Sequence, residues 1–148
     1  MKKLKIILLI ALIIFAGIQF IPTERNIANE VPETDFIKMY NPPENVANIL
    51  QNACYDCHSN NTAYPWYNKV QPVSWFLEGH INEAKEHLNF SEFGQLSDRK
   101  KRSRIKSIAG QIKDGEMPLF SYKVLHKEAR LDSEAQALVI EYMQNLKI

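Results

Sequence analysis

Residues 54–58 read Cys-Tyr-Asp-Cys-His and contain both cysteines of the 148-residue chain. On a helical turn, two thiols at this spacing reach one edge of a porphyrin, and the histidine that follows can place an imidazole nitrogen on its iron. The C-x-x-C-H pattern is typical of a c-type haem site. It predicts one haem held covalently by Cys54 and Cys57, with His58 as the proximal ligand. No thiol remains for a disulfide.

Three other interpretations of the pattern stay open. A thioredoxin-like dithiol needs alternating strands and helices, which the sequence does not suggest. A structural zinc site needs four ligands, and a second cysteine pair is missing, although His80, His87 or His126 could each supply one ligand. The pattern could also arise by chance in a reduced cytosolic protein.

The first 21 residues have the composition of a membrane-targeting segment. Three lysines among the first five residues precede an almost unbroken apolar run over 6–21. At about 1.5 Å per residue this run spans about 24 Å, short of a ~30 Å bilayer core unless the lysines snorkel. The sequence predicts an uncleaved anchor in the inner membrane, with the rest of the chain on the periplasmic side. A cleaved signal would instead give a secreted periplasmic form.

Composition divides the remainder into a spacer and one domain. Residues 22–43 are polar and contain four prolines, which predicts a flexible linker, and residues 44–148 form the domain. Without the three N-terminal lysines the chain has 15 basic and 17 acidic residues. This near-balance excludes the basic footprint of a nucleic-acid-binding protein.

Apolar periodicity predicts an all-α domain of three to four helices with long loops. Apolar side chains recur at helical spacing over residues 44–57, 72–88, 98–114 and 133–146. Asp132 or Ser133 is expected to cap the last helix, which should pack across the first. The face expected to be buried in the second helix consists of Phe76, Leu77, His80, Ile81, Ala84 and Leu88.

The loop over residues 59–71 is unusually aromatic for a soluble segment. We expect Tyr64 and Trp66 of this loop, with Trp75 of the next helix, to pack on the haem. Pro65 or Pro72 could present a backbone carbonyl to the outer ring nitrogen of His58 and so orient the ligand. The alternative is a small aromatic cluster without haem contact.

A Met-Pro pair supplies the expected distal ligand. Gly115 should end the third helix, and Pro118 keeps Met117 out of a helix. A thioether sulfur opposite a histidine closes the sixth position and raises the reduction potential of the iron. His80 is a rival distal ligand on the face of the second helix. Either residue could instead be ordinary core packing.

The start of the third helix is strongly basic. Residues 99–104 read Arg-Lys-Lys-Arg-Ser-Arg. A run of this kind usually forms a solvated helix face. It could also bind haem propionates or dock an acidic redox partner.

The order of these motifs resembles a class I cytochrome c, with C-x-x-C-H after the first helix and Met-Pro before the last. Residues from about 40 to 146 resemble more closely the small bacterial family described as the haem-binding domain. The resemblance is carried by residues 54–60, 64–67, 72–75, His80, 90–93, 117–119, Tyr122, His126 and Ala129. It implies a covalent haem on Cys54 and Cys57 with His58 axial, and no settled physiological role.

The sequence therefore predicts a membrane-anchored c-type haem protein that transfers single electrons to an unknown redox partner protein and is not an enzyme. One alternative is a sensor or gas-binding module with a labile sixth ligand. A peroxidase would have to use His80 as its distal acid–base residue. A zinc-stabilised protein without redox function is the fourth possibility.

Overall fold

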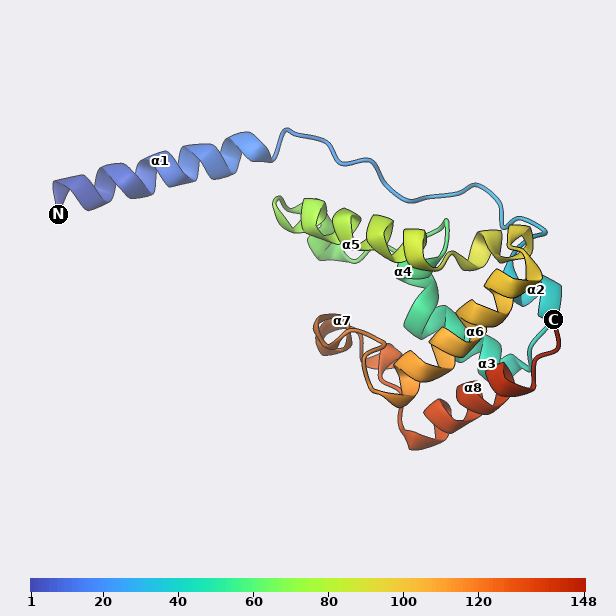
Figure 1. The fold of residues 1–148 in the computed structure, drawn as a ribbon. Coiled ribbons are helices and arrows are strands. Elements are labelled where there is room, and N and C mark those ends of the chain that lie inside the picture. Colours follow the sequence, from blue (N-terminus) through green and yellow to red (C-terminus); the bar gives the residue numbers. More distant parts are fainter.

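The computed structural model describes residues 1–148 and is helical, without strands, which confirms the all-α prediction (Figure 1). The longer helices are α1 (Lys2–Ile18), α5 (Val73–His87), α6 (Asp98–Lys113) and α8 (Ser133–Asn145). Shorter α-helices are α2 (Phe36–Tyr40), α3 (Glu44–Leu50), α4 (Asp56–His58) and α7 (Phe120–Leu125). A π-helix, η1 (Gln51–Tyr55), and three 3₁₀ segments, η2 (Trp66–Lys69), η3 (Phe90–Gln95) and η4 (Lys127–Ala129), complete the chain.

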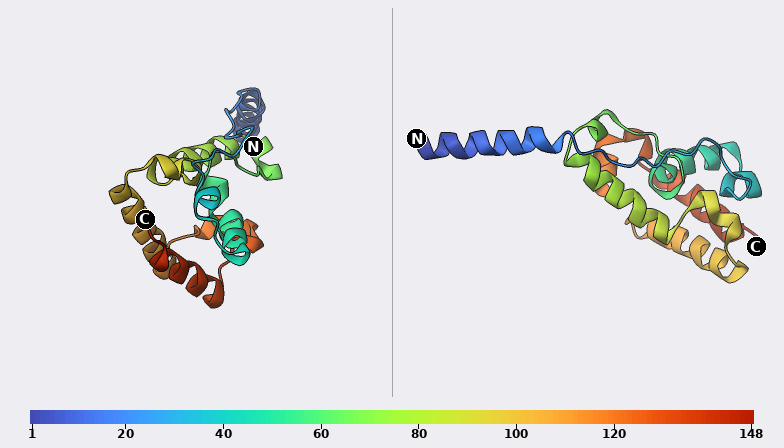
Figure 2. Two further views of the ribbon diagram at one scale, coloured as in Figure 1. Left: turned by 90° about the vertical axis from the view of Figure 1, so that its right-hand side faces the viewer. Right: turned by 90° about the horizontal axis from the view of Figure 1, so that it is seen from above.

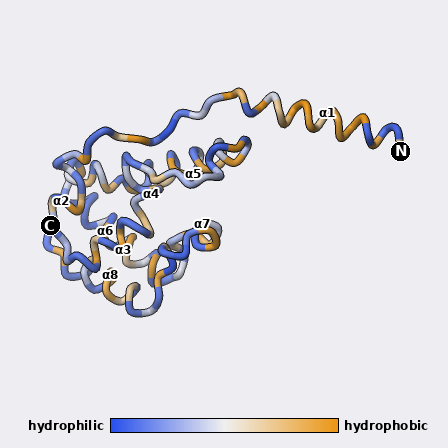
Figure 3. Tube along the Cα trace, turned by 180° about the vertical axis from the view of Figure 1, so that it is seen from behind, coloured by the Kyte–Doolittle hydropathy of each residue, from blue (hydrophilic) through white to orange (hydrophobic).

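Helix α1 projects from the domain and buries none of its 17 residues (Figure 2). It is the most continuously apolar part of the chain, as the hydropathy colouring shows (Figure 3). No helix of the structure combines the length and apolar character needed to cross a membrane.

Residues 19–35, here called the strap, overlap the predicted linker of residues 22–43 and are hydrogen-bonded to the domain. The strap runs along α5 to α2 (Figure 1). Thr23 Oγ1 accepts from Gln71 Nε2 at 2.7 Å and from Ser74 Oγ at 2.9 Å. Asn26 Nδ2 donates to the carbonyl of Ser59 at 2.8 Å, directly after the C-x-x-C-H motif. The strap is therefore held to the domain by side-chain hydrogen bonds. It lacks the apolar periodicity by which packed segments are usually recognised in a sequence.

Helix α2 also belongs to the domain rather than to a spacer. Asp35 caps it by accepting from the backbone N–H groups of Ile37 and Lys38. Phe36 is 0% exposed and packs edge-on against Phe90 and Phe93, with ring centroids 5.5 and 5.0 Å away. The folded unit thus begins before residue 44, because a helix of five residues is too short for its period to be seen.

The first predicted domain helix is one continuous helical stretch formed by α3, η1 and α4. Val46 and Leu50 of α3 are buried, as their spacing predicted. The π-helical segment covers Cys54 and widens the turn just before the second cysteine. Such π-bulges are frequent at functional sites because the extra residue redirects the side chains around it.

Helix α5 has the predicted bounds but is rotated relative to the expected buried face. Its buried residues are Ser74, Glu78 and Ile81, whereas Phe76 is 73% exposed. Ser74 lies beneath the strap, bonded to Thr23. The polar side of α5 is therefore covered by the strap, which the apolar pattern alone could not predict.

Helices α6 and α8 pack against each other, and α8 also contacts α3 as predicted. The expected stripe of α6, Ile105, Ile108, Ala109 and Ile112, is buried. Gly115 ends this helix with a φ of 72°, a conformation that favours glycine. Asp132 caps α8 by accepting from the backbone N–H of Ala135 at 2.8 Å. The main core joins α6 and α8 to α2, α3 and η3.

Candidate functional site

His58 ends α4 and is held by the C-terminal end of α5. Its Nδ1 lies 3.1 Å from the carbonyl oxygen of Ala84 and 3.0 Å from that of Leu88. Carbonyls only accept hydrogen bonds, so Nδ1 carries the proton and Nε2 keeps its lone pair. The contact with Leu88 is favourable because Leu88 is the C-cap of α5 and its carbonyl lies past the last helical hydrogen bond, whereas the carbonyl of Ala84 also accepts from the backbone N–H of Leu88 at 2.9 Å. The carbonyls of Pro65 and Pro72, expected in this role, do not fill it.

The environment of His58 keeps its imidazole neutral. Burial lowers the pKa of His58 against the opposing effect of its two backbone hydrogen bonds. The ring also meets Phe90 edge-on, with centroids 6.5 Å apart. A neutral imidazole with a fixed tautomer and a free Nε2 is the form that binds a metal.

Both cysteines are free thiols. Cys54 lies in η1, and Cys57 lies in α4, directly before His58. Burial raises the pKa of Cys54 to about 12 and that of Cys57 to about 11, with Asp56 adding to the second shift. Both thiols are therefore protonated at neutral pH. Cys54 lines the cavity described next, whereas Cys57 does not and lies close enough to Tyr67 and Tyr122 to raise their pKa values.

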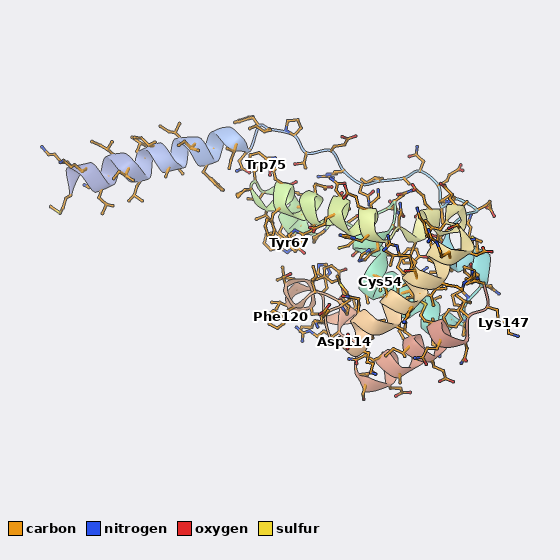
Figure 4. The ribbon with its side chains drawn as sticks, in the orientation of Figure 1. Cys54, Tyr67, Trp75, Asp114, Phe120 and Lys147 are labelled. Atoms are coloured by element: carbon orange, nitrogen blue, oxygen red, sulfur yellow. The ribbon has the colours of Figure 1, made fainter.

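A cavity of about 540 Å³ lies between α5 and α6, a volume in the range of small-molecule and cofactor sites. It brings together Cys54, His58, His80 and Met117, all of which the sequence singled out. Figure 4 shows Cys54 in the middle of the domain, among these helices. The apolar part of the wall is formed by Ala53, Ala84, Leu88, Phe90, Ile108, Ile112, Pro118 and Leu119. The cavity thus combines apolar walls with a few convergent polar groups.

Met117 reaches this cavity from the turn that ends α6. The backbone N–H groups of Glu116 and Met117 both donate to the carbonyl of Gln111, at 3.0 and 3.2 Å. The turn is thereby bonded to the last turns of the helix, and Met117 is half-buried. Met117 and His58 therefore line the same cavity.

Two further histidines line the cavity, and one expected histidine does not. His80 and His87 are seven residues apart on α5, and both contribute to the wall. His80 uses Nδ1 to contact the carbonyl of Phe76 at 2.8 Å, which leaves its Nε2 free. His126 is engaged elsewhere by Tyr67 and Glu128. The sequence analysis named His80 as a rival distal ligand and His87 only as a possible zinc ligand, and the side chain of His87 is largely exposed.

The three aromatic residues assigned to haem packing do not line the cavity. Trp66 is 78% exposed. Trp75 lies near the end of α5 that faces α1, away from Cys54 (Figure 4). The hydroxyl of Tyr64 instead accepts from the backbone N–H of Asn26 in the strap at 2.6 Å. Phe90 is the aromatic residue that the cavity wall does contain.

The loop after Met117 is fastened to the motif by a hydrogen-bonded cluster that the sequence did not reveal. Tyr122 of α7 donates to Oδ2 of Asp56 at 2.6 Å. Its ring stacks on His126, with centroids 4.1 Å apart, and His126 Nε2 lies 2.9 Å from the hydroxyl of Tyr67. Burial, followed by Asp56, raises the pKa of Tyr122, so its phenol stays protonated. The cluster joins η2, α4 and α7 beside Cys57.

Polar residues of α6 complete the cavity, and sequence reasoning identified only one of them. Arg104, Ser107 and Gln111 line the wall opposite α5. Arg104 belongs to the basic run and is the only lysine or arginine in the lining. Serine and glutamine on an amphipathic helix give no signal of their own, because they are common on solvated faces.

The structure offers no alternative metal centre. No group of three or more histidine, cysteine, aspartate or glutamate side chains is arranged to hold a metal ion. This disfavours the four-ligand zinc site, because Cys54 and Cys57 have no third partner within reach.

A helical domain with this set of groups, namely an apolar cavity, two adjacent thiols and a histidine with a free Nε2, defines a haem-binding protein. The model of the family described as "Haem-binding domain" matches residues 13–145, from within α1 to the end of α8. The chain belongs to this family. Comparisons with curated proteins and with solved structures found no match.

Proposed function

We propose that the protein is a c-type haem protein that transfers single electrons. The thiols of Cys54 and Cys57 hold the haem as thioethers, His58 is the proximal ligand, and Met117 is the distal ligand. The observation that carries the proposal is the tautomer of His58, whose Nδ1 lies against two carbonyls so that Nε2 stays free, together with the cavity that His58, Met117 and Cys54 line.

When bound, the haem iron supplies a one-electron couple. The residues of the chain would bind and orient the haem. The carbonyls of Ala84 and Leu88 hold His58 in place, and its depressed pKa keeps the imidazole unprotonated for ligation. The apolar part of the wall would keep water from the haem, and Met117 would supply its thioether as the second iron ligand in place of exchangeable ligands. A low-dielectric site with fixed ligands suits electron transfer, because little has to move when the charge changes.

Covalent attachment is tested by haem staining after denaturing electrophoresis of protein made with a cytochrome c maturation system. We expect the wild type to retain haem and the double variant Cys54→Ala/Cys57→Ala to lose it. Cys57→Ala alone should retain less haem than the wild type. Equal staining of the double variant and the wild type would contradict thioether attachment.

The proposed location is the periplasmic side of the inner membrane, with the N-terminal segment directing export. Three lysines followed by the apolar residues of α1 support export. Retention of α1 as an anchor, or its removal, is decided by the mass of the mature protein and by its fractionation. Recovery of haem-free protein in the cytoplasm alone would contradict this location.

A second candidate function is a haem sensor or gas-binding module. Its specific support is that His80 and His87 line the same cavity as Met117, so the sixth position has several possible occupants. Carbon monoxide should then bind the reduced protein readily. A reduced native protein that does not bind carbon monoxide would exclude this function.

A further inference from the structure

Helix α6 carries a large share of the positive charge of the protein. It contains seven of the 18 lysines and arginines and one of the 17 acidic residues, a net charge of +6. Apart from the three lysines near the N-terminus, the rest of the chain has eight basic and 16 acidic side chains, a net charge of −8 with neutral histidines. The positive charge is therefore concentrated on one helix of an otherwise acidic domain.

Most of this positive charge does not stabilise α6. Its seven cationic side chains form no ion pair in the structure, whose two pairs lie elsewhere. Arg99 and Lys100 occupy the first turn, where the helix dipole disfavours positive charge. Arg102 and Lys106 are four residues apart on the helix surface, where like charges repel. Only Lys113, in the last turn, is placed favourably for the helix dipole. Since the fold gains little from the other six cationic side chains, an external partner is the better explanation.

The same helix separates the haem cavity from the outer surface. Ile108 and Gln111 line the cavity together with Arg104, the basic residue that reaches it. The other side of α6 forms a groove of about 500 Å³ with α8, with an apolar floor that includes Ile105 and Ile140. Three cationic residues, Arg102, Lys106 and Lys113, also line this groove. A partner bound here would be one helix away from the haem.

We infer that the outward face of α6 is the docking surface for an acidic protein that donates single electrons to the haem. One electron passes from the reduced centre of the partner to the ferric iron, which becomes ferrous while the partner is oxidised, and no bond is made or broken. The inference rests on the proposed electron-transfer function and adds the site and the charge of the partner.

Two observations favour a protein over a membrane surface. The apolar floor of the groove suits an apolar side chain of a protein at the centre of an acidic patch. Helices α1 and α6 lie towards opposite ends of the molecule (Figures 1 and 2). The face of α6 is thus remote from the segment that is proposed to meet the membrane.

The test uses full-length holoprotein in neutral detergent and a reduced plant-type ferredoxin as the acidic one-electron donor. Stopped-flow spectroscopy gives the second-order rate constant for haem reduction at low salt. The double variant Arg102→Glu/Lys106→Glu is compared with Lys69→Glu/Lys127→Glu, which makes the same charge change at exposed sites outside α6. We expect a decrease of about tenfold or more for the α6 variant and less than about threefold for the control.

Rate measurements at high salt and with a small reductant distinguish a loss of partner docking from damage to the haem site. The difference between the two variants should nearly vanish at about 1 M salt, where the Debye length is about 3 Å. Dithionite should reduce all three proteins equally. A haem that dithionite cannot reduce would contradict the proposed function itself, whereas equal reduction with no specific effect of α6 would contradict only the docking surface.

Two controls complete the test. Lys106→Gln, which removes one charge without reversing it, should lower the rate less than the double variant, and it replaces that variant if the double change prevents folding. Vesicles with and without phosphatidylglycerol test the membrane explanation. Loss of anionic-vesicle binding in the α6 variant, with an unchanged ferredoxin rate, would overturn the inference and assign the surface to a membrane.

Discussion

The phenol of Tyr122 donates a 2.6 Å hydrogen bond to Oδ2 of Asp56 and so fastens the segment after Met117 to the middle of the C-x-x-C-H motif. One contact therefore links the helix that ends at His58, the proposed proximal ligand, to the loop that follows Met117, the proposed distal ligand. Because Cys57 lies beside the same tyrosine, the link also borders one attachment point. We expect it to control how firmly Met117 stays at the sixth position.

Tyr122→Phe should therefore destabilise the protein and loosen the distal side. A hydrogen bond to a carboxylate contributes about 1.5–3 kcal/mol, and partial exposure reduces this to about 1–2 kcal/mol here. Chemical denaturation checks the stability, and carbon monoxide binding to the reduced holoprotein should become faster.

Tyr142→Phe is the matched control, since it removes the same atom from a buried hydroxyl that has no hydrogen-bond partner. Its stability should change by less than about 0.5 kcal/mol or increase, because an unsatisfied polar atom is removed. Equal destabilisation by the two substitutions would contradict a special role for the contact between Tyr122 and Asp56.

Phe36→Ala tests whether the domain begins before residue 44. The ring is fully buried among Phe90 and Phe93, so its removal should cost about 3–5 kcal/mol of unfolding free energy. Ile27→Ala, at a side chain that is 57% exposed, should cost less than about 1 kcal/mol. If urea unfolding showed that Phe36→Ala lowers the unfolding free energy as little as Ile27→Ala does, α2 would not be part of the folded domain.

The thiols should make the haem-free protein sensitive to alkaline pH. Burial raises the pKa of Cys54 to about 12 from an ordinary value of 9.0. Between pH 9 and 12 the unfolded chain therefore binds fewer protons than the folded chain, so stability falls as pH rises through this window. At pH 8, iodoacetamide should alkylate Cys54 at least about tenfold more slowly in the native than in the denatured protein. Equal rates would contradict the raised pKa of the Cys54 thiol.

Met117→Ala distinguishes the candidate distal ligands. The holoprotein should keep its haem but show a lower reduction potential and faster carbon monoxide binding, because loss of the thioether opens the sixth position. His80→Ala and His87→Ala should leave the spectrum of the oxidised protein unchanged. If His80→Ala instead abolishes the native spectrum, His80 rather than Met117 is the distal ligand.

The elements predicted correctly are those in which local sequence and burial agree. The four isoleucine and alanine positions of α6 recur at helical spacing and are all buried, and Gly115 and Asp132 mark helix ends by their backbone preferences. The convergence of Cys54, His58, His80 and Met117 on one cavity agrees with their assignment, although their bonds to haem stay predictions.

What the sequence could not show depends on contacts between distant segments. Phe90 and Phe93 lie between the helices predicted from periodicity, in a 3₁₀ segment of six residues that has no visible helical period. The carbonyls that orient His58 belong to residues 26 and 30 positions further along the chain, at the C-terminal end of α5. Asn26 of the strap bonds to Ser59 across a separation of 33 residues. No local pattern records such pairings.

The central claim is that Cys54 and Cys57 hold a covalent haem between His58 and Met117. The most direct test is a pyridine haemochrome spectrum of the matured protein, followed by the absorption spectrum of the native oxidised form. The account predicts a c-type haemochrome together with the weak far-red band of a methionine–iron bond. A c-type haemochrome without that band would contradict ligation by Met117, and the absence of a c-type haemochrome would contradict attachment through Cys54 and Cys57.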